Sequence, residues 1–598
     1  MTNFSTKIDA FREILVLPLR ISKADRNPEW PKFLTEKLGS GNFVWEKTTA
    51  RTPTQSRAFV ASGLEKPEPE KFDSTIQEKI QSAQKEAVDE YNKRWAFGEM
   101  AYFHPFVQDF LYDAKPDAPC HWYTLEKQLD RIRVEAQMGV KIRNCDSYVI
   151  DLLVDRCELA FLPDPGLAIL VLEIVATSNT KLIRYNSDST VKVIEDTLTL
   201  GDALSLHDIV RRIYPPFFKT LKPQHDRRTY DLSLFPLSVD CNPDKKLKPR
   251  RKPQDLSYLA EELVPGKKLP YAPWWHELLA PLVINNRFTQ VVDERMPSMI
   301  FLGMKSTKQL SKQDLIRLCF ADHPGNGAPY DPDFMKNFMA EHGYRRFSHL
   351  GTTYFASSYS FVCVTETQGS WNSPKFVFGR DVIQEHFRRH YAKMFFIVQM
   401  QKAALLSFSS SLSDVLSAKS SNSNSYYESI RKMRVNFLAF THRYWFSNVS
   451  NQEQARELFA LMQKHAGNHV LYEEVNKESA AAREEMLIEA QHNEMEAAQS
   501  QADSAKLTNI IIMILTAMTV PMVYFTDHMN RSFFWVMALS TGLVGLFTLI
   551  YAGRQDRPTT ESWLIRSLFG VSLFFFVACL FFAWHAIYGS FPFFPPPK

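Results

Sequence analysis

The sequence predicts an α/β domain, a long α-helical stalk and an all-α transmembrane domain, in that order along the chain. Three observations predict this fold class. Short apolar runs separated by turn residues fill roughly the first 400 residues, a helical pattern starts near residue 426, and three uncharged apolar runs follow residue 506. These changes of pattern divide the chain into a cytoplasmic α/β domain 1–400, a serine-rich linker 401–425, a helical stalk 426–506 and a transmembrane domain 507–598.

The α/β domain is predicted from short runs of strand-forming residues. Residues 13–19 (EILVLPL) and 299–304 (MIFLGM) have the length and the apolar character of buried strands. Residues 158–177 hold two apolar runs around Pro-Asp-Pro-Gly, which predicts a hairpin with a tight turn. Residues 351–366 alternate well enough to form a second hairpin or one bent strand.

Composition excludes several classes of function. A net charge of +4 over 598 residues is too small to indicate a nucleic-acid partner. The seven cysteines are scattered, odd in number and without a CxxC pair, which argues against a disulfide framework and a zinc ribbon and indicates a reducing cytosol. We find no P-loop, GxGxxG, GxSxG or HExxH motif, so we expect no enzyme activity. His386 and His390, four residues apart, could bind a metal on one helix face, but no third ligand is evident.

Two polar segments stand out within the first 425 residues. Residues 242–253 place six basic residues around three prolines, which predicts either a site for a soluble anionic ligand or lipid headgroups, or a solvated connector. In residues 407–425 ten of nineteen residues are serine, which predicts a flexible linker or a poorly ordered loop.

The stalk is predicted from a helical pattern that has one break. Residues 426–447 and 451–465 read as helices, and Gly467-Asn468 is a stop signal. Residues 469–506 contain no glycine or proline, and no breaker precedes the apolar run that ends at Phe525. Residues 473–505 carry a net charge of −7, which is either a solvated helix face or, in a symmetric ring, a negative vestibule for cations. The acidic face comprises Glu484, Glu485, Glu489, Glu494, Glu496 and Asp503.

The transmembrane domain is predicted from runs 507–525, 533–551 and 568–588, each near the ~20 residues that a bilayer core demands. The loop after the second run holds three arginines, and the loop after the first run holds one. The positive-inside rule therefore predicts a multi-pass protein of the plasma (inner) membrane, with its large N-terminal part in the cytoplasm and the lipid bilayer as a partner.

Polar residues of the first run lie on one helical stripe. The stripe, at steps of three and four, comprises Asn509, Ile512, Thr516, Thr519, Val523, Thr526 and Asn530. Such a face packs against another helix through hydrogen bonds or lines a water-filled ion pathway. The pathway interpretation is supported by Asp527 and Asn530 at the outer end, whose oxygen atoms suit Mg²⁺ or its hydration shell.

A long acidic helix, this first run, a loop with Met-Asn and a second run together resemble the CorA-type family of divalent-cation channels. The family's hallmark is Gly-Met-Asn at the outer end of the first span, where this chain has His528-Met529-Asn530. The resemblance covers residues 430–551 and implies a homopentamer whose first spans line the pore. We expect an outer mouth formed by Asp527, His528, Met529 and Asn530. The resemblance implies that Asn530 binds the hydrated ion there and that Asn509, Thr516 and Thr519 are inner polar positions. It also implies that the ion is Mg²⁺ or another divalent cation, without a further cofactor.

The chain departs from the family plan at His528, in its third apolar run and in its large N-terminal domain. A second function therefore stays open beside cation transport. Divergent members of the family are associated with prokaryotic defence, which implies a ligand-gated effector whose large head senses a soluble ligand.

Overall fold

The computed structural model describes residues 4–21, 45–47, 93, 95–112, 118–125, 131–137, 147–177, 180, 182–185, 191–194, 198–213, 288–291, 295–322, 329–367, 376–417, 423–524 and 577. The chain forms two compact units, residues 1–482 and residues 483–598. The first unit holds the sheet and the helices around it, and the second begins within the last helix.

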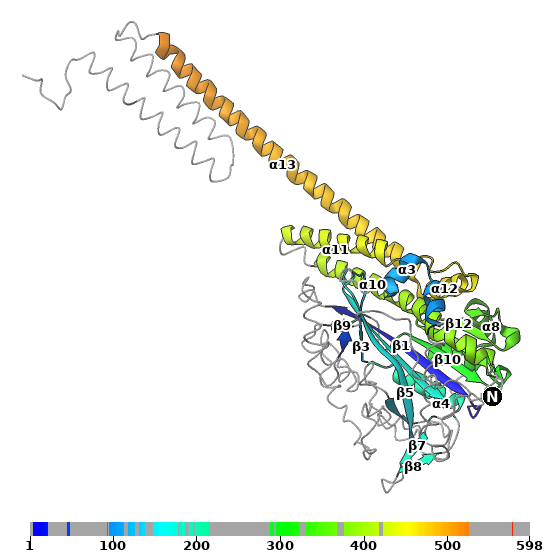
Figure 1. The fold of residues 1–598 in the computed structure, drawn as a ribbon. Helices are drawn as coiled ribbons and strands as arrows, with labels where there is room; N and C mark the ends of the chain where they lie inside the picture. The colour runs from blue at the N-terminus through cyan, green and yellow to red at the C-terminus, as the bar shows by residue number, and fades with distance from the viewer. Residues whose placement is uncertain are drawn as a thin grey trace, which may run out of the picture. The chain divides into compact units, whose positions relative to one another are not determined.

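The described strands of the first unit form one mixed sheet (Figure 1). Its main path runs β11-β12-β13-β10-β1-β6-β5-β3-β2, with β4, β7, β8 and β9 paired off this path. The β10–β13 pair is parallel, whereas the neighbours of β1, β5 and β12 are antiparallel. The strands are β1 (Ala10–Ile21), β2 (Glu46–Lys47), β3 (His121–Thr124), β4 (Arg131–Gln137), β5 (Ser147–Leu162), β6 (Leu167–Thr177), β7 (Leu182–Tyr185), β8 (Val191–Ile194), β9 (Phe288–Gln290), β10 (Ser298–Met304), β11 (Gly343–Tyr344), β12 (Thr353–Ala356) and β13 (Ser360–Glu366).

Strand β1 lies at the centre of this sheet and is buried on both faces. It pairs with β6 from Ala10 to Arg20 and with β10 from Ala10 to Leu15. Leu15 and Leu17 belong to one hydrophobic core, and Ile14 and Val16 belong to the core on the opposite face. A strand covered on both sides needs apolar residues at nearly every position, which explains the continuous run that predicted it.

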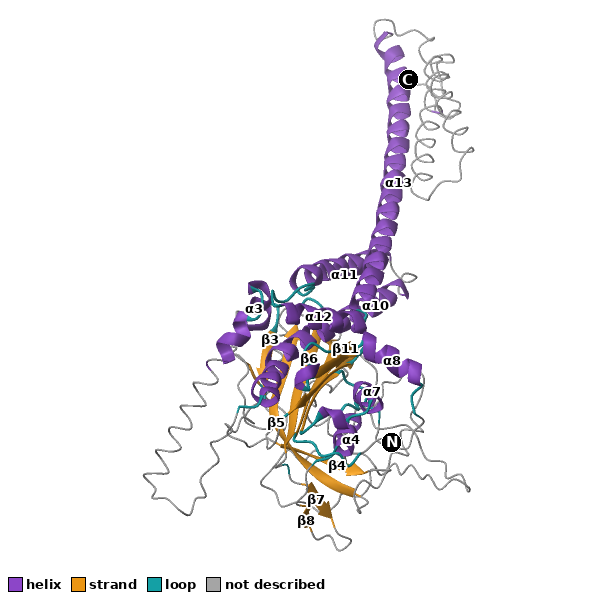
Figure 2. Ribbon diagram, turned by 90° about the vertical axis from the view of Figure 1, so that its right-hand side faces the viewer, coloured by secondary structure: helices purple, strands orange, loops and turns teal. Residues whose placement is uncertain are grey.

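Helices cover both faces of the sheet (Figure 2). One face packs against α4 (Leu200–Val210), α7 (Lys312–Phe320) and α8 (Pro332–Glu341). The other packs against α3 (Pro105–Tyr112), α10 (Ala392–Ser417) and α12 (Glu453–Ala466), so the unit has three layers with a core on each side of the sheet. Further elements are α9 (Gln384–His386), α11 (Ser423–Arg443), α13 (Asn468–Tyr524), the 3₁₀ turns η4 (Thr307–Gln309) and η5 (Ser348–Leu350), and the π-helical turns η6 (Gly379–Ile383) and η7 (Phe387–Tyr391).

Both predicted hairpins are present. Strands β5 and β6 are joined by the predicted turn, in which Gly166 has a φ of 66°, a conformation that glycine adopts without strain. Strands β12 and β13 form the second hairpin around residues 357–359. The predicted strand 299–304 is likewise confirmed as β10.

The serine-rich segment differs from the expected linker. Helix α10 continues through its first half to Ser417, and α11 begins at Ser423. Ser407 and Ser411 are 3% and 7% exposed, and their neighbours Phe408 and Leu412 belong to the core. The apolar positions between the serines anchor this helix, so packing overrides the low helix propensity of serine.

Gly467 separates the last two helices, as the stop signal predicts. It is the C-cap of α12 with a φ of 75°, and its N–H donates to the carbonyl of Gln463. Helix α13 then begins at Asn468 and continues without interruption for 57 residues to Tyr524. The residues predicted as stalk and as first span are therefore parts of one helix.

In the part of the chain that the structure describes, no helix combines the length and the apolar character needed to cross a bilayer. This finding contradicts the predicted all-α transmembrane domain, the classification as a membrane protein and the multi-pass localisation in the plasma membrane. Residues 507–524 are the last part of a helix that is acidic over much of its length. The predicted spans 533–551 and 568–588 lie outside the described residues, apart from Val577.

We predict that Gly467→Ala lowers the free energy of unfolding by about 1–2 kcal/mol, because a side chain in the left-handed region is strained. Urea denaturation measures this change. Gly98→Ala is the matched control, since a Cβ would meet nothing within 4 Å at either position and only Gly467 has a positive φ. Equal effects of the two substitutions would contradict the role of Gly467 as a conformational break.

Candidate functional site

A β-bulge in β5 directs two neighbouring charged residues to one face of the sheet. Val154 lies opposite Ile174 of β6, but Arg156 lies opposite Glu173, so Asp155 is the extra residue. Val154 and Cys157 both belong to the core on the α4 side, although they are three residues apart. The bulge therefore places Asp155 and Arg156 together on the opposite face, which regular alternation would forbid.

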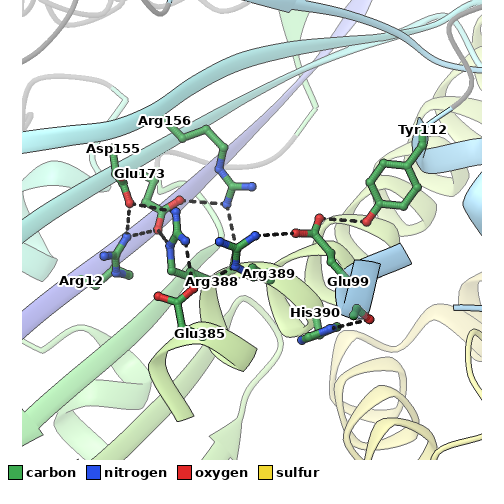
Figure 3. A network of polar contacts seen from close by, with 11 residues as sticks. Arg12, Glu99, Tyr112, Asp155, Arg156, Glu173, Glu385, Arg388, Arg389 and His390 are labelled. Atoms are coloured by element: carbon green, nitrogen blue, oxygen red, sulfur yellow. Dashed lines mark hydrogen bonds and ion pairs between the residues drawn. The ribbon is translucent and has the colours of Figure 1, made fainter. Parts of the chain in front are cut away.

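Three strands contribute charged side chains to this face (Figure 3). Arg12 of β1 donates from Nη1 to Asp155 Oδ2 at 2.6 Å, and the same nitrogen donates to Glu173 Oε1 of β6. Arg156 Nη2 lies 3.0 Å from Glu173 Oε2. The strands thus present two carboxylates between two guanidinium groups, beneath the helical layer.

The helical layer adds charges from a segment with π-helical turns. Arg388 Nη2 donates to Asp155 Oδ2 at 3.3 Å, and its Nη1 donates to Glu385 Oε2 at 3.1 Å. Arg389 donates from Nε to the same Glu385 oxygen at 2.8 Å. The consecutive residues Arg388, Arg389 and His390 are all buried, and the π-helical turn Phe387–Tyr391 widens the buried face accordingly.

The network continues to the helical residues around Glu99. Arg389 Nη1 lies 3.4 Å from Glu99 Oε2, and the Tyr112 hydroxyl donates to Glu99 Oε1 at 2.8 Å. The Arg389 guanidinium also lies over the ring of Trp95, 5.7 Å from its centroid. Glu99 therefore connects the 95–112 segment to the helix that carries Arg389.

All eight charged groups of this network are less than a tenth exposed. Four arginines (Arg12, Arg156, Arg388 and Arg389) meet four carboxylates (Glu99, Asp155, Glu173 and Glu385), so the network is neutral as a set. Neutrality matters because an unpaired charge in the interior costs several kcal/mol. We call these eight residues the charge network.

The pKa shifts of Glu99 and Arg388 indicate that these two residues are charged. Burial alone would raise the pKa of Glu99, but the charges of Lys393 and Arg389 and the Tyr112 hydroxyl hold it below the usual value. Burial alone would lower the pKa of Arg388, but the charges of Glu385, Asp155 and Glu173 raise it above its usual value. The attraction within the network thus outweighs the desolvation of these two groups.

Two neutral imidazoles border the network. The rings of His386 and His390 lie 4.6 Å apart between centroids, and His390 Nε2 lies 3.4 Å from the Gly98 carbonyl oxygen. Burial lowers the pKa of His386 to about 4, and burial together with the proximity of the His386 ring lowers the pKa of His390 to about 3. Among the described residues, no group of three or more His, Cys, Asp or Glu side chains could hold a metal ion.

A second buried polar site lies on the other face of the sheet. Glu13 Oε1 lies 2.8 Å from His207 Nδ1, and His207 Nε2 lies 3.1 Å from the Leu318 carbonyl oxygen. Burial raises the pKa of Glu13 and lowers that of His207. A carbonyl oxygen can only accept, so Nε2 carries the hydrogen and the neutral Glu13 carboxyl donates to Nδ1. This pair is uncharged although it is formed by an acid and a base.

The predicted ion-pathway residues that the structure describes lie along one helix, α13. Asn509 is exposed on α13, and Thr516, Thr519 and Val523 lie further along the same helix. Thr526 and the predicted outer mouth, Asp527, His528, Met529 and Asn530, lie outside the described residues, as does the basic segment 242–253. Of the predicted acidic face, Glu484, Glu485, Glu494 and Glu496 are exposed, Asp503 is half-buried beside Lys506, and Glu489 lies in the same helix.

No family model matches the chain, and no curated protein or solved structure matches it significantly. The resemblance to the CorA-type family stays a prediction. The site is therefore classified from its geometry alone. It is a neutral, buried network of charged residues that joins the sheet to the helices above it.

Sequence reasoning missed the charge network entirely. The signal was present in two places: Arg12 and Glu13 precede the apolar run of β1, and Glu173 interrupts the apolar run of β6. A charged residue inside a buried strand requires a partner. The partners lie 143 and 161 positions away from Arg12, which is why no local pattern could identify them.

We predict that Arg388→Met destabilises the protein by about 3–5 kcal/mol, because it leaves buried carboxylates without their partner. Chemical denaturation measures the loss. Arg443→Met is the control, since the Arg443–Asp164 pair is 3.1 Å long but half-exposed and should contribute less than about 1 kcal/mol. A loss below about 1 kcal/mol at Arg388 would contradict a tightly coupled network.

We predict that Glu13→Gln keeps the fold, because the amide can donate to His207 Nδ1 as the neutral carboxyl does. The folded pKa of Glu13 is raised, so the wild-type protein loses stability as pH rises above the unfolded value of about 4.3, and the variant does not. The stability of the variant relative to wild type should therefore grow by up to about 1.4 kcal/mol per pH unit above that value. Denaturation at pH 4 to 7 tests this, and a constant difference would exclude a neutral Glu13.

Proposed function

We propose that this chain is a homo-oligomeric signalling protein without catalytic activity, in which the unit of residues 1–482 senses a soluble anionic ligand. The charge network carries this proposal. It joins β1, β5 and β6 to η7 and to the 95–112 segment through buried ion pairs, so a change at one end alters the electrostatic balance at the other.

Glu99 is the point at which a ligand would act. Its carboxylate is held by Arg389 and Tyr112 and by the field of Lys393, a set of donors that also suits a phosphate or a carboxylate. Glu99 belongs to a short helical segment and not to the sheet, and the neighbouring Trp95 is partly exposed. We propose that Glu99 is an internal anion that an external one replaces.

Replacement of Glu99 would be transmitted to the helical layer. The 95–112 segment packs on this layer through Phe110, which contacts the rings of Phe396 and Tyr444 at centroid distances of 6.4 and 5.7 Å. The Ser450 hydroxyl donates to the Tyr102 carbonyl within the same contact. A shift of this segment therefore changes the packing around α10 and around the residues that precede α12.

Two observations favour sensing over catalysis. Cys319 and Cys363 are unsuited to nucleophilic attack, since burial raises the pKa of both thiols above the usual value. The acids and bases of the charge network are bound to one another and not arranged around an open position. Such a network supports a two-state element better than proton transfer to a substrate.

Oligomer formation is supported by helix α13, which exposes Leu487, Ile488 and Met495. Exposed apolar side chains along one helix are typical of helix–helix association. Cation passage along the stripe of Asn509, Thr516 and Thr519 stays a prediction, as does the role of Mg²⁺.

We predict that ATP and inorganic pyrophosphate raise the melting temperature of the full chain, because a bound anion stabilises the folded state. Glu99→Gln should bind either anion about tenfold more tightly, since it removes the competing charge, whereas Arg389→Met should abolish binding. Lys393→Met serves as a second test if Arg389→Met does not fold.

The control is Arg443→Met, which removes an exposed arginine outside the network. Hydrogen exchange of residues 95–112 should increase when the anion binds, as the segment loses the Glu99 contact. The proposal would be overturned if millimolar anion shifted the melting temperature of neither the wild-type protein nor Glu99→Gln. It would also be overturned if Arg389→Met and Lys393→Met bound the anion as tightly as the wild-type protein does.

A further inference from the structure

Helix α11 presents a basic face with exposed apolar residues. Val435 and Leu438 are 59% and 47% exposed, and Arg431 and Lys432 are exposed one turn before them. Arg431, Val435 and Leu438 lie at intervals of four and three, which places them on one stripe of the helix. The whole helix has a net charge of +3. An exposed stripe of this composition is typical of a surface that binds an acidic, partly apolar helix.

Helix α13 presents the complementary character. Ile488 and Met495 are 61% and 64% exposed, and Glu484 and Glu494 are exposed beside them. Glu484, Ile488 and Met495 lie at intervals of four and seven and thus share a stripe as well. The surrounding residues 473–505 carry a net charge of −7. Both stripes therefore place a charged residue one turn before an exposed apolar one, with opposite signs of charge.

We propose that the basic face of α11 in one copy of the chain binds the acidic face of α13, residues 484–496, in a second copy. This inference rests on the homo-oligomer of the proposed function and names the two surfaces that form it. The apolar side chains would supply the area buried, and the charges would select the partner and its orientation.

Charge is the reason to prefer this pairing over association of two α13 helices. Two copies of a helix segment with a net charge of −7 repel each other when they lie side by side, whereas α11 offers the opposite sign. Ion pairs at an exposed interface are screened within about 8–10 Å at physiological salt. The proposed contact must therefore weaken as the salt concentration rises.

The test is a charge-reversal cycle on the full chain, followed by sedimentation velocity at low and high salt. Arg431→Glu with Lys432→Glu should weaken association of the copies about tenfold or more, because two attractive contacts become repulsive. Glu484→Lys with Glu494→Lys should weaken it similarly. Combining the four substitutions should restore association, which loss of folding in either parent could not produce.

The matched control is Lys336→Glu with Lys464→Glu, which makes the same charge change at exposed positions of α8 and α12 and should leave association unchanged. A monomeric wild-type protein would overturn the proposed oligomer itself. If the oligomer persists in both charge-reversal variants, only the α11–α13 contact is overturned. The same holds if the control variant loses association as much as the charge-reversal variants do. If Ile488→Glu abolishes association while Arg431→Glu with Lys432→Glu has no effect on it, the interface is formed by paired α13 helices instead.

Discussion

Two adjacent charges in the middle of a strand that is buried on both sides constrain the whole first unit. Arg12 and Glu13 point to opposite faces of β1, and neither face offers water. Each charge must therefore be compensated by the layer above it or below it. On one side Arg12 forms ion pairs that extend through the charge network. On the other side Glu13 is neutral and forms a hydrogen bond with His207.

A β-bulge and a π-helical turn of the first unit serve this compensation. A bulge in β5 places two charged neighbours on the same side, and a π-helical turn places three consecutive polar residues in the interior. Both depart from regular geometry, and they meet at Arg388. Arg388 lies in the π-helical turn, donates to Asp155 of the bulge and accepts from Arg156 through its carbonyl oxygen. Regular strands and helices would present these side chains on alternating faces and leave some of the charges alone.

Much of the fold follows from local patterns in the sequence, whereas the site does not. The run around Leu15, the turn before Gly166 and the break at Gly467 each carry their own signal, because strand burial and backbone conformation act over a few residues. The serine-rich half of α10 is helical because of tertiary contacts that composition does not reveal. The charge network joins residues from six segments, so no spacing rule encodes it. The prediction of a membrane-spanning domain was wrong for the part of the chain that the structure describes, where no helix is long and apolar enough to cross a bilayer and residues 507–524 complete an acidic helix.

The ends of the main strand path limit how this protein can assemble. Strands β11 and β2 are two residues long each, and so offer almost no free backbone N–H and C=O groups to another sheet. Addition of a strand from a neighbouring molecule at these ends would gain few hydrogen bonds, which also protects the sheet from edge-to-edge aggregation. Recognition between copies through side chains on helices does not depend on these strand ends, and it can discriminate by residue identity and by charge.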